Sequence, residues 1–273
     1  MLSYQHGYHA GHFADVVKHL TLTRLLNYLL RKVKPLFYLE THSGRGSYDL
    51  QHKQAAKTKE YLQGISILWE QKDKLSPLFK PYIDIISTIN PTHELRFYTG
   101  SPCLAITMLR AQDRLYCCEL HPGEFEHLQQ LSRQGKRVFY SNSDGLASIN
   151  TLLPPIERRG LIFIDPSFEI KSEYKEIPKL IKSAYQRFST GIFCLWYPLV
   201  DKRLHKQLLL GMADIKAGST LHLEVNFTSP GQIGMTGCGL WIINPPYVLK
   251  EEMNHILQEL CKLVNSKATF FIS

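Results

Sequence analysis

Residues 36–48 constrain the fold more than any other stretch of the sequence. A short apolar run, residues 36–39, ends at the acidic residue Glu40 and leads into a turn that contains Gly44 and Gly46. An apolar run of this length before a turn is typical of a buried parallel strand. Glycine allows a positive φ and a close approach of the backbone to a ligand. We therefore predict a strand, a tight turn and a ligand site where the strand ends.

The glycine spacing of this turn distinguishes between nucleotide cofactors. A dinucleotide-binding turn reads Gly-x-Gly-x-x-Gly, but no third glycine follows Gly44 and Gly46, so NAD is disfavoured. The pattern Glu40-x-x-x-Gly44-x-Gly46 instead resembles the first motif of class I methyltransferases, whose turn wraps the methionine half of S-adenosylmethionine (SAM). An ordinary glycine-rich turn between a strand and a helix is the alternative interpretation.

The composition limits the size of the fold and the kind of partner. With 273 residues, of which 44% are hydrophobic, the chain can bury one substantial core, or one core that carries a smaller insertion. Lysine and arginine number 32 and aspartate and glutamate 24, so the formal net charge is +8. This excess favours contact with a polyanion such as nucleic acid.

The cysteine pattern and the hydropathy indicate a compartment. The six cysteines form no Cys-x-x-Cys pair, so we expect buried free thiols in a reducing compartment. No basic and apolar signal segment begins the sequence, and no apolar stretch approaches the roughly 20 residues that cross a bilayer. We expect a cytoplasmic protein that contacts no membrane.

Histidines are dense among the first 19 residues, which suggests a site at His6, His9, His12 and His19. A metal held by His9 and His12 is the less favoured interpretation, because no second ligand cluster follows at a recognisable spacing, and we predict no metal site. Apolar residues at helical spacing then predict a helix over residues 14–33 that leads into the first strand.

The segment after the glycine turn has helical rather than strand periodicity. We expect one helix around residues 61–69 and a second around residues 83–89. The predicted organisation is therefore a main domain, residues 1–50 and 96–273, with a helical insertion at residues 51–95. Lysines of the insertion, among them Lys53, Lys57 and Lys59, form either a solvated face, which we slightly favour, or an arm that contacts phosphates.

Strands then alternate with helical stretches, as in a parallel sheet with helices on both faces. We expect strands at residues 114–118, 137–140, 160–164 and 192–197, and an antiparallel terminal pair at residues 221–227 and 239–243. The expected fold class is α/β, with a Rossmann-like, mostly parallel sheet and an inserted helical subdomain.

Four successive strands end in acidic residues, Glu40, Glu119, Asp144 and Asp165. Ligands of open α/β sheets bind at the carboxyl ends of the strands. In a SAM site, an acid after the second strand can accept both ribose hydroxyls, and one after the third can accept the adenine amine. Each acid taken alone could instead be a helix N-cap or a turn residue.

These landmarks together resemble the RlmJ family, bacterial enzymes that methylate an adenine N6 amine of 23S ribosomal RNA. The likeness covers nearly the whole chain. It is carried by the N-terminal Met-Leu-Ser-Tyr-x-His segment, Asp15-Val-x-Lys18-His19, Thr41-His42-x-Gly44-x-Gly46, Gly100-Ser101-Pro102, Glu119-Leu-His-Pro, Asp144-Gly145, Ile164-Asp165-Pro166 and Leu195-Trp196-Tyr197-Pro198.

The resemblance implies SAM as the cofactor, ribosomal RNA as the partner, a monomer, and a helical subdomain after the first strand. Asp165 would be catalytic and would also contact SAM, and Tyr4 and Lys18 would lie on the substrate side. The other implied SAM contacts are His19, His42, Gly44, Gly46, Ser101, Glu119, Asp144 and Gly145.

The chemistry explains the acceptor residues. An adenine amine is a weak nucleophile because its lone pair is delocalised, so two acceptors should hold its N–H groups and favour pyramidal geometry at nitrogen. The Asp165 carboxylate and the Pro166 carbonyl suit this role, and catalysis then depends on orientation and on electrostatics around the sulfonium. Phe168 would stack on the extruded base.

The acceptor tetrapeptide departs from the usual Asp/Asn-Pro-Pro-aromatic pattern, because Ser167 replaces the second proline. That proline would restrict Pro166 to an extended conformation. A DNA adenine methyltransferase, and a nucleic-acid-binding protein whose catalysis Ser167 has weakened, are therefore the alternative functions. A closer match to the pattern begins at Asn244, but we reject it as the active site because it follows an antiparallel strand that ends at the opposite edge of the sheet.

Overall fold

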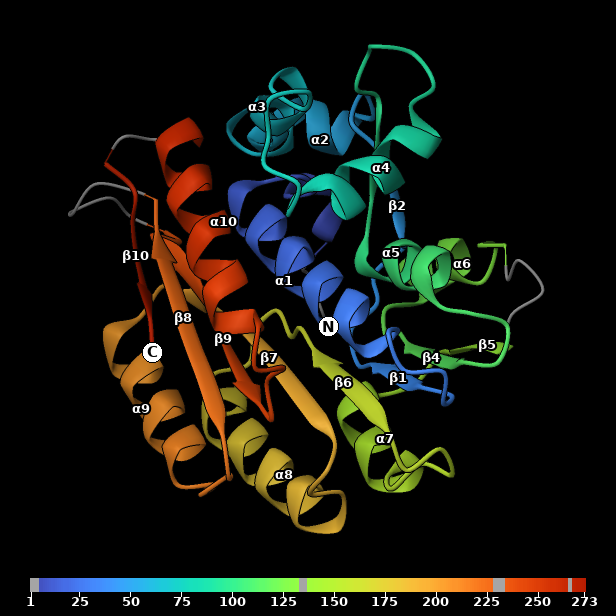
Figure 1. The fold of residues 1–273 in the computed structure, drawn as a ribbon, viewed down its shortest axis with the longest axis vertical. Coiled ribbons are helices and arrows are strands. Elements are labelled where there is room, and N and C mark those ends of the chain that lie inside the picture. The colour runs from blue at the N-terminus through green and yellow to red at the C-terminus, as the bar shows by residue number, and fades with distance from the viewer. Residues whose placement is uncertain (1–4, 133–136, 228–233, 265–266) are drawn as a thin grey trace.

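The computed structural model describes residues 5–132, 137–227, 234–264 and 267–273. Its centre is an eight-stranded sheet with the strand order β10-β8-β9-β7-β6-β1-β4-β5 (Figure 1). In chain order, the strands of this sheet are β1 (Phe37–Glu40), β4 (Arg114–Cys118), β5 (Arg137–Ser141), β6 (Gly160–Ile164), β7 (Ile192–Leu199), β8 (Thr220–Asn226), β9 (Gly237–Ile243) and β10 (Thr269–Ile272).

The predicted strand β1 lies inside the sheet and pairs in parallel with both β4 and β6. The chain runs from β1 to β4 and β5 on one side and returns to β6 on the other, so a topological switch point lies between β1 and β6. Ligands of open α/β sheets bind at such a point, beyond the carboxyl ends of the strands. Glu40 and Asp165 therefore lie at the edge of the sheet where a cofactor is expected.

The antiparallel pairing of β8 with β9 confirms the predicted pair, and β9 is also antiparallel to β7. This pair does not form the edge of the sheet, however, because β10 adds to β8. β10, a four-residue strand that follows a long helix and is only partly buried, was not predicted. Such a short segment acquires its strand geometry from the neighbour with which it pairs.

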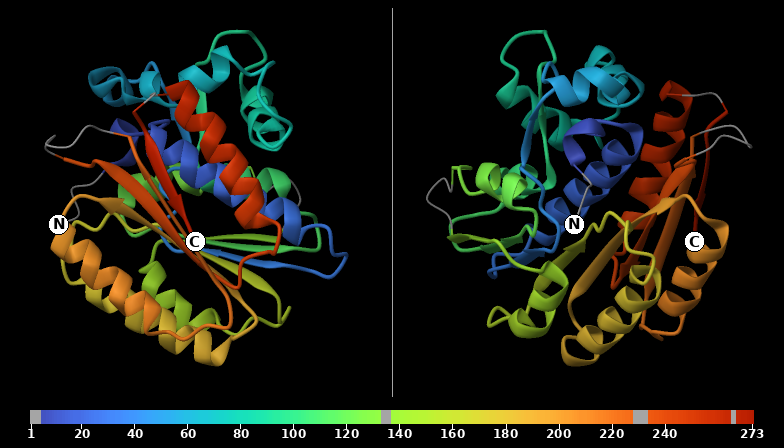
Figure 2. Two further views of the ribbon diagram at one scale, coloured as in Figure 1. Left: turned by 60° about the vertical axis from the view of Figure 1, so that its left-hand side comes forward. Right: turned by 180° about the vertical axis from the view of Figure 1, so that it is seen from behind.

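Helices cover both faces of the sheet, as Figure 2 shows. Alternate side chains of β1 point to opposite faces, so Tyr38 packs in one apolar cluster while Phe37 and Leu39 pack in the other. This double burial explains the continuous apolar run of residues 36–39. The helices on the Tyr38 side are α1 (Phe13–Leu29), α5 (Ser101–Met108), α6 (Pro122–Leu128) and α10 (Leu249–Val264), and those on the other side are α7 (Gly145–Leu152), α8 (Glu173–Arg187) and α9 (Lys202–Ala213).

The segment after the glycine turn is helical, but the prediction of one continuous helix around residues 61–69 is wrong. This stretch is divided at Gly64, where a Cβ atom would lie 2.1 Å from the carbonyl oxygen of Gly11, so this close contact interrupts the helix. A two-stranded ribbon, which was not predicted, closes the segment. The elements are β2 (Ser47–Asp49), α2 (Lys53–Thr58), the 3₁₀ helix η2 (Glu60–Gln63), α3 (Ile65–Glu70), α4 (Lys80–Ile89) and β3 (Phe97–Thr99), preceded in the chain by η1 (His6–Tyr8).

The helical segment shares its core with the rest of the protein. Leu68, Tyr82 and Ile86 are fully buried and belong to the same apolar cluster as Leu20 and Leu22 of α1. The division into residues 1–50 with 96–273 and residues 51–95 stays a prediction, because these contacts do not test it. Within the described residues, no helix is both long and apolar enough to cross a membrane.

Candidate active site

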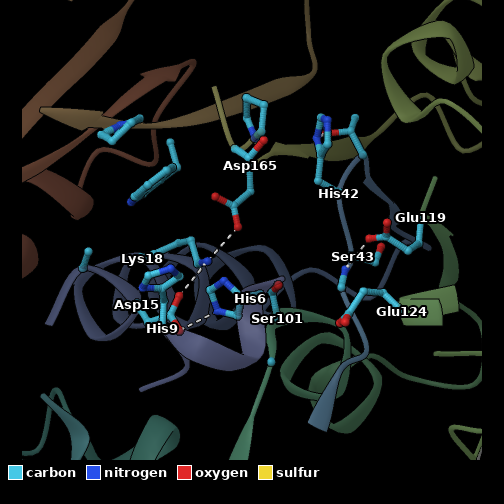
Figure 3. A pocket seen from close by; sticks show the side chains of 18 of the residues that line it. His6, His9, Asp15, Lys18, His42, Ser43, Ser101, Glu119, Glu124 and Asp165 are labelled. Carbon is cyan, nitrogen blue, oxygen red and sulfur yellow. Dashed lines mark hydrogen bonds and ion pairs between the residues drawn. The ribbon is translucent and has the colours of Figure 1, made fainter. Parts of the chain in front are cut away.

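A cavity of about 550 Å³ lies beyond the carboxyl ends of the parallel strands. The residues after β4, β5 and β6 contribute Glu119, Asp144 and Asp165, which confirms that three of the four acidic strand ends meet at one site. Figure 3 shows Asp165, His42 and Glu119 around this space, with Lys18 of α1 joined to both Asp165 and Asp15. The fourth acid, Glu40, is fully buried and lies outside the cavity lining.

The turn after β1 has the conformation that its glycines predict. Gly44 has a φ of 59° and Gly46 a φ of 80°. The Gly44 amide donates a hydrogen bond of 2.8 Å to Oε2 of Glu119, and the His121 amide donates one of 2.7 Å to Oε1. Burial raises the pKa of Glu119. These two hydrogen bonds hold the Glu119 carboxylate in position before any ligand binds. Each carboxylate oxygen still has a lone pair that can accept a hydrogen bond from a ligand hydroxyl.

Asp144 and Gly145 form the start of α7. Asp144 is the N-cap, and its Oδ1 accepts hydrogen bonds from the amides of Leu146 (2.8 Å) and Ala147 (3.2 Å). The alternative interpretation as a helix cap is therefore correct for Oδ1. Oδ2 accepts no hydrogen bond from the described residues. A Cβ atom on Gly145 would lie 2.0 Å from the carbonyl oxygen of Thr41, so only glycine lets α7 begin against the β1 turn.

His19, His42 and Ser101 line the cavity from three different elements. His19 hydrogen-bonds through Nδ1 to the Tyr98 hydroxyl (2.7 Å), and burial lowers its pKa to about 3. Burial also lowers the pKa of His42 to about 4, and its Nδ1 lies 2.7 Å from the Thr41 hydroxyl. Both imidazoles are therefore neutral at pH 7 and can act as hydrogen-bonding groups without adding charge.

Ser101 connects the cavity to Glu40 at the end of β1. Its hydroxyl donates a hydrogen bond to Oε1 of Glu40, and the Tyr38 hydroxyl donates one of 3.1 Å to Oε2. Burial raises the pKa of Glu40 to about 8. We infer that this acid holds Ser101 and the start of α5 in position from beneath the cavity.

Asp165 is held by the buried ammonium of Lys18. Nζ of Lys18 lies 2.6 Å from Oδ2 of Asp165 and 2.8 Å from Oδ1 of Asp15 (Figure 3). Burial alone would lower the pKa of Lys18, but the two carboxylates outweigh it and raise that pKa above its usual value. Lys18 therefore carries a charge, and Oδ1 of Asp165 accepts no hydrogen bond from the described residues.

Phe168 lies apart from the predicted stacking position. Its side chain is only 6% exposed, contacts Tyr174 at a ring-centroid distance of 4.4 Å, and lies outside the cavity lining. A φ of 55° at Phe168 directs the chain after Ser167 so that the ring enters the core. In this conformation Phe168 cannot stack on a base in the cavity. Tyr4, another predicted substrate residue, lies outside the described residues.

The N-terminal histidines belong to the same cavity, as their density suggested. His6 pairs with Asp15 through Nε2 (2.7 Å), and Nδ1 of His9 lies 3.0 Å from Glu60. His12 caps α1 by accepting a hydrogen bond from the Ala14 amide. Among the residues that the structure describes, no group of three or more His, Cys, Asp or Glu side chains has the arrangement of a metal site.

The second acceptor-like motif lies away from the cavity. Asn244 follows the antiparallel strand β9, and its amide donates to the carbonyl oxygens of Ser189 (2.7 Å) and Gly191 (2.8 Å). Tyr247 is 82% exposed. These contacts give the motif a structural role and agree with the topological argument against it.

Several residues in the cavity lining or next to it were not predicted, because no local pattern distinguishes them. Arg45 of the glycine turn donates through Nε to Oε2 of Glu124 (2.9 Å) and so attaches the turn to α6. Trp196 of β7 lies beside Lys18, whose Nζ is 5.7 Å from the indole ring. In the sequence, only its place in the Leu195-Trp196-Tyr197-Pro198 motif indicated that Trp196 belongs to the site. Glu173, at the start of α8, also lines the cavity.

The cavity suits SAM in its donor and acceptor groups. The left-handed glycine turn allows a methionine moiety to approach the backbone closely, and Glu119 keeps acceptor capacity for a ribose. Oδ2 of Asp144, which accepts no hydrogen bond from the described residues, can accept one from an adenine amine. The parallel sheet, the antiparallel strand β9 beside β7 and this cavity at the switch point define a class I SAM-dependent methyltransferase.

Comparison with known proteins gives the family. A family model described as "Ribosomal RNA large subunit methyltransferase D, RlmJ" matches residues 33–270. Ribosomal RNA large subunit methyltransferase J of Escherichia coli (strain K12) is 39% identical, over 94% of this chain and 92% of its own, and that of Haemophilus influenzae (strain ATCC 51907 / DSM 11121 / KW20 / Rd) is 40% identical, over 98% and 96%. The chain belongs to this RlmJ family of ribosomal RNA large subunit methyltransferases.

A solved structure shares the whole fold. The crystal structure of protein LPL1258 from Legionella pneumophila str. Philadelphia 1 is 51% identical in sequence, covers 97% of this chain and 98% of its own, and superimposes with a TM-score of 0.93. The arrangement of strands and helices described above is therefore shared with an experimentally determined relative.

We expect Glu119→Ala to remove most of the stabilisation that the cofactor gives. A ligand that binds only the folded state stabilises it by about 2.7 kcal/mol at 100 times Kd, and Glu119 joins the glycine turn to the loop after β4. Thermal unfolding with and without saturating S-adenosylhomocysteine measures the effect. If the ligand raises the Tm of folded Glu119→Ala protein as much as that of wild type, this carboxylate is not a cofactor contact.

Proposed function

We propose that this protein transfers the methyl group of SAM to the exocyclic N6 amine of an adenine in 23S ribosomal RNA. Membership of the RlmJ family supports methyl transfer to large-subunit ribosomal RNA. The observation that carries the adenine assignment is the Asp165-Pro166 turn, which follows β6 at the switch point and lines the same cavity as Glu119 and Asp144.

The site's residues have distinct tasks in this proposal. Lys18 holds Oδ2 of Asp165, which leaves Oδ1 to accept one N–H of the target amine, and the Pro166 carbonyl accepts the other. Bound SAM supplies a methyl group that its sulfonium activates. Because the protein supplies no covalent step, its contribution is the orientation of the amine and the exclusion of water.

The buried surroundings of Asp165 support this orientation. The side chain of Asp165 is 12% exposed, and that of Lys18 is 5% exposed. Trp196 and Pro198 add an apolar wall to the cavity on the β7 side. An extruded base needs such a wall, because it loses its stacking partners when it leaves the RNA helix.

The partner and the compartment are also proposals. The relatives from Escherichia coli and Haemophilus influenzae are named as ribosomal RNA methyltransferases, and the formal charge of +8 suits a polyanion. We propose that the protein works as a monomer in the cytoplasm.

The deciding experiment is methyl transfer from labelled SAM to protein-free large-subunit ribosomal RNA, compared with duplex DNA. N6-methyladenine in the RNA alone is the expected product. Transfer to DNA in preference to RNA would favour the DNA methyltransferase alternative. RNA binding with no transfer would favour the alternative in which Ser167 has weakened catalysis.

RNA binding should weaken steeply with salt if the helical segment contacts phosphates. Lys53, Lys57 and Lys59 are exposed, and each phosphate contact contributes about 0.7 to 0.9 to the slope of log K against log salt. We expect the triple change to alanine to reduce the slope by about 2.

The matched control changes Lys202, Lys206 and Lys216 to alanine; these lysines are also exposed and lie on or beside α9. Lys59 and Lys216 both have a φ of 53°, so the two triple variants share the same backbone cost. If both variants show the same slope, the lysines of the helical segment form a solvated face and do not contact phosphates.

A further inference from the structure

One part of the cavity combines apolar surface with two carboxyl groups. Leu120 is 50% exposed and Ile170 is 51% exposed, and both line the cavity together with Leu146, Asp144 and Glu173. Large exposed aliphatic side chains at a concave site point to a ligand with apolar faces. The two carboxyl groups place polar atoms in the same region.

Contacts between the loops bring these residues together. The Asn142 amide donates hydrogen bonds of 2.7 and 3.2 Å to the carbonyl oxygens of Glu119 and Leu120, which joins the loop after β4 to the loop after β5. The Glu173 amide donates to the Ile170 carbonyl oxygen (3.0 Å). Helices α7 and α8, which begin at Gly145 and Glu173, pack against each other. Asp144 and Glu173 therefore approach the cavity from adjacent helix starts.

Glu173 has an unexplained polar atom. Its Oε2 is shielded from solvent and has no hydrogen-bond partner in the part of the chain that the structure describes. A buried carboxyl oxygen without a partner is costly, and the cost is greater when the group is charged, so this position favours the neutral acid. Neither the family landmarks nor the strand-end pattern includes this residue.

Glu173 is surrounded by other acids. Burial raises its pKa to about 7, and Glu169 before the helix, Asp144 at the α7 N-cap and Glu176 on the next turn of α8 add to the rise. The titratable groups that line the cavity also include His42, Asp165, Lys18, Glu119 and His121. Near neutrality a large part of Glu173 is therefore a neutral acid, which has an O–H donor as well as an acceptor.

The ligand that suits this region has flat apolar faces, an amine that donates and a ring nitrogen that accepts. An adenine ring has all three. We propose that Glu173 is a specificity-determining residue of the cofactor site, whose carboxyl group donates a hydrogen bond to a ring nitrogen of the cofactor's adenine while Asp144 accepts its amine. This inference rests on the proposed function, since it takes SAM as the cofactor.

The inference predicts how affinity changes with pH. An ionised Glu173 has no proton to donate and repels the neighbouring Asp144, so the cofactor should bind the protonated form. Affinity is then full below pH 7 and falls as the pH rises through that value. Between pH 6 and pH 8 the loss should be about tenfold. S-adenosylhomocysteine is the better probe, because it has the same adenine but no sulfonium charge.

The experiment measures the Kd of S-adenosylhomocysteine by calorimetry at pH 6 and pH 8, without RNA. Wild type should bind about tenfold more weakly at pH 8. Glu173→Gln keeps an N–H donor that cannot ionise, so it should bind with a similar Kd at both pH values. Glu173→Ala should bind about tenfold more weakly than wild type at pH 6. Glu126→Gln, an exposed change on α6, should behave as wild type.

The outcomes separate this inference from the proposed function. A pH dependence that persists in Glu173→Gln would assign it to another group, such as a cavity histidine, and would overturn the inference. An unchanged Kd for Glu173→Ala at pH 6 would overturn it as well. If wild type fails to bind at either pH, the proposed function itself is wrong, and the inference falls with it.

Discussion

Asp165→Ala should lower kcat for methyl transfer by about 1000-fold and change the SAM affinity by less than about tenfold. Asp165 supplies the acceptor that meets the reacting amine, and this interaction strengthens as the amine becomes pyramidal. An interaction made mainly in the transition state affects kcat more than binding. Single-turnover transfer of labelled methyl groups to ribosomal RNA, with SAM affinity measured separately, gives both quantities.

Two further variants keep this prediction testable. Asp165→Asn retains a carbonyl acceptor and the side-chain shape, so it should lose much less activity than Asp165→Ala. Asn244→Ala removes contacts with Ser189 and Gly191 at the opposite edge of the sheet and should leave turnover unchanged in the folded protein. If Asn244→Ala abolishes transfer and Asp165→Ala does not, the active site lies at the C-terminal motif.

Lys18→Met should destabilise the protein by about 3 to 5 kcal/mol and also reduce kcat. The ammonium pairs with Asp15 and Asp165 in a site where its side chain is only 5% exposed. Without it, two carboxylates lose their shared buried cation. Urea unfolding followed by circular dichroism measures the free energy of unfolding.

The matched control is Lys32→Met, which removes an exposed lysine and should change the free energy of unfolding by less than about 0.5 kcal/mol. The double variant Lys18→Met with Asp15→Asn should recover part of the lost stability, because one of the unpaired charges is gone. Equal stability of wild type and Lys18→Met would show that the ion pairs contribute no net energy.

The parts of the site that depend on local chain geometry were predictable. Gly44 and Gly46 have positive φ because the turn between β1 and the next segment is too tight for other residues. Glu119, Asp144 and Asp165 meet because the carboxyl ends of parallel strands share one edge of the sheet. Both features follow apolar runs, so they can be recognised from neighbouring residues in the sequence.

Features that depend on contacts between distant segments were not predictable. Gly64 divides the expected helix because Gly11, far away in the chain, packs against it. β10 becomes a strand only by pairing with β8. Phe168, an aromatic residue in the expected stacking position of its motif, enters the core because its backbone is left-handed and Tyr174 receives its ring.

The fold class, the glycine turn and the acidic strand ends could be predicted, since each depends on residues close together in the chain or on strand order. The contacts between side chains came only from the folded structure: Lys18 between Asp15 and Asp165, and Ser101 on Glu40. A side chain's charge state and direction depend on burial and on partners from other segments, which residue type and spacing do not encode.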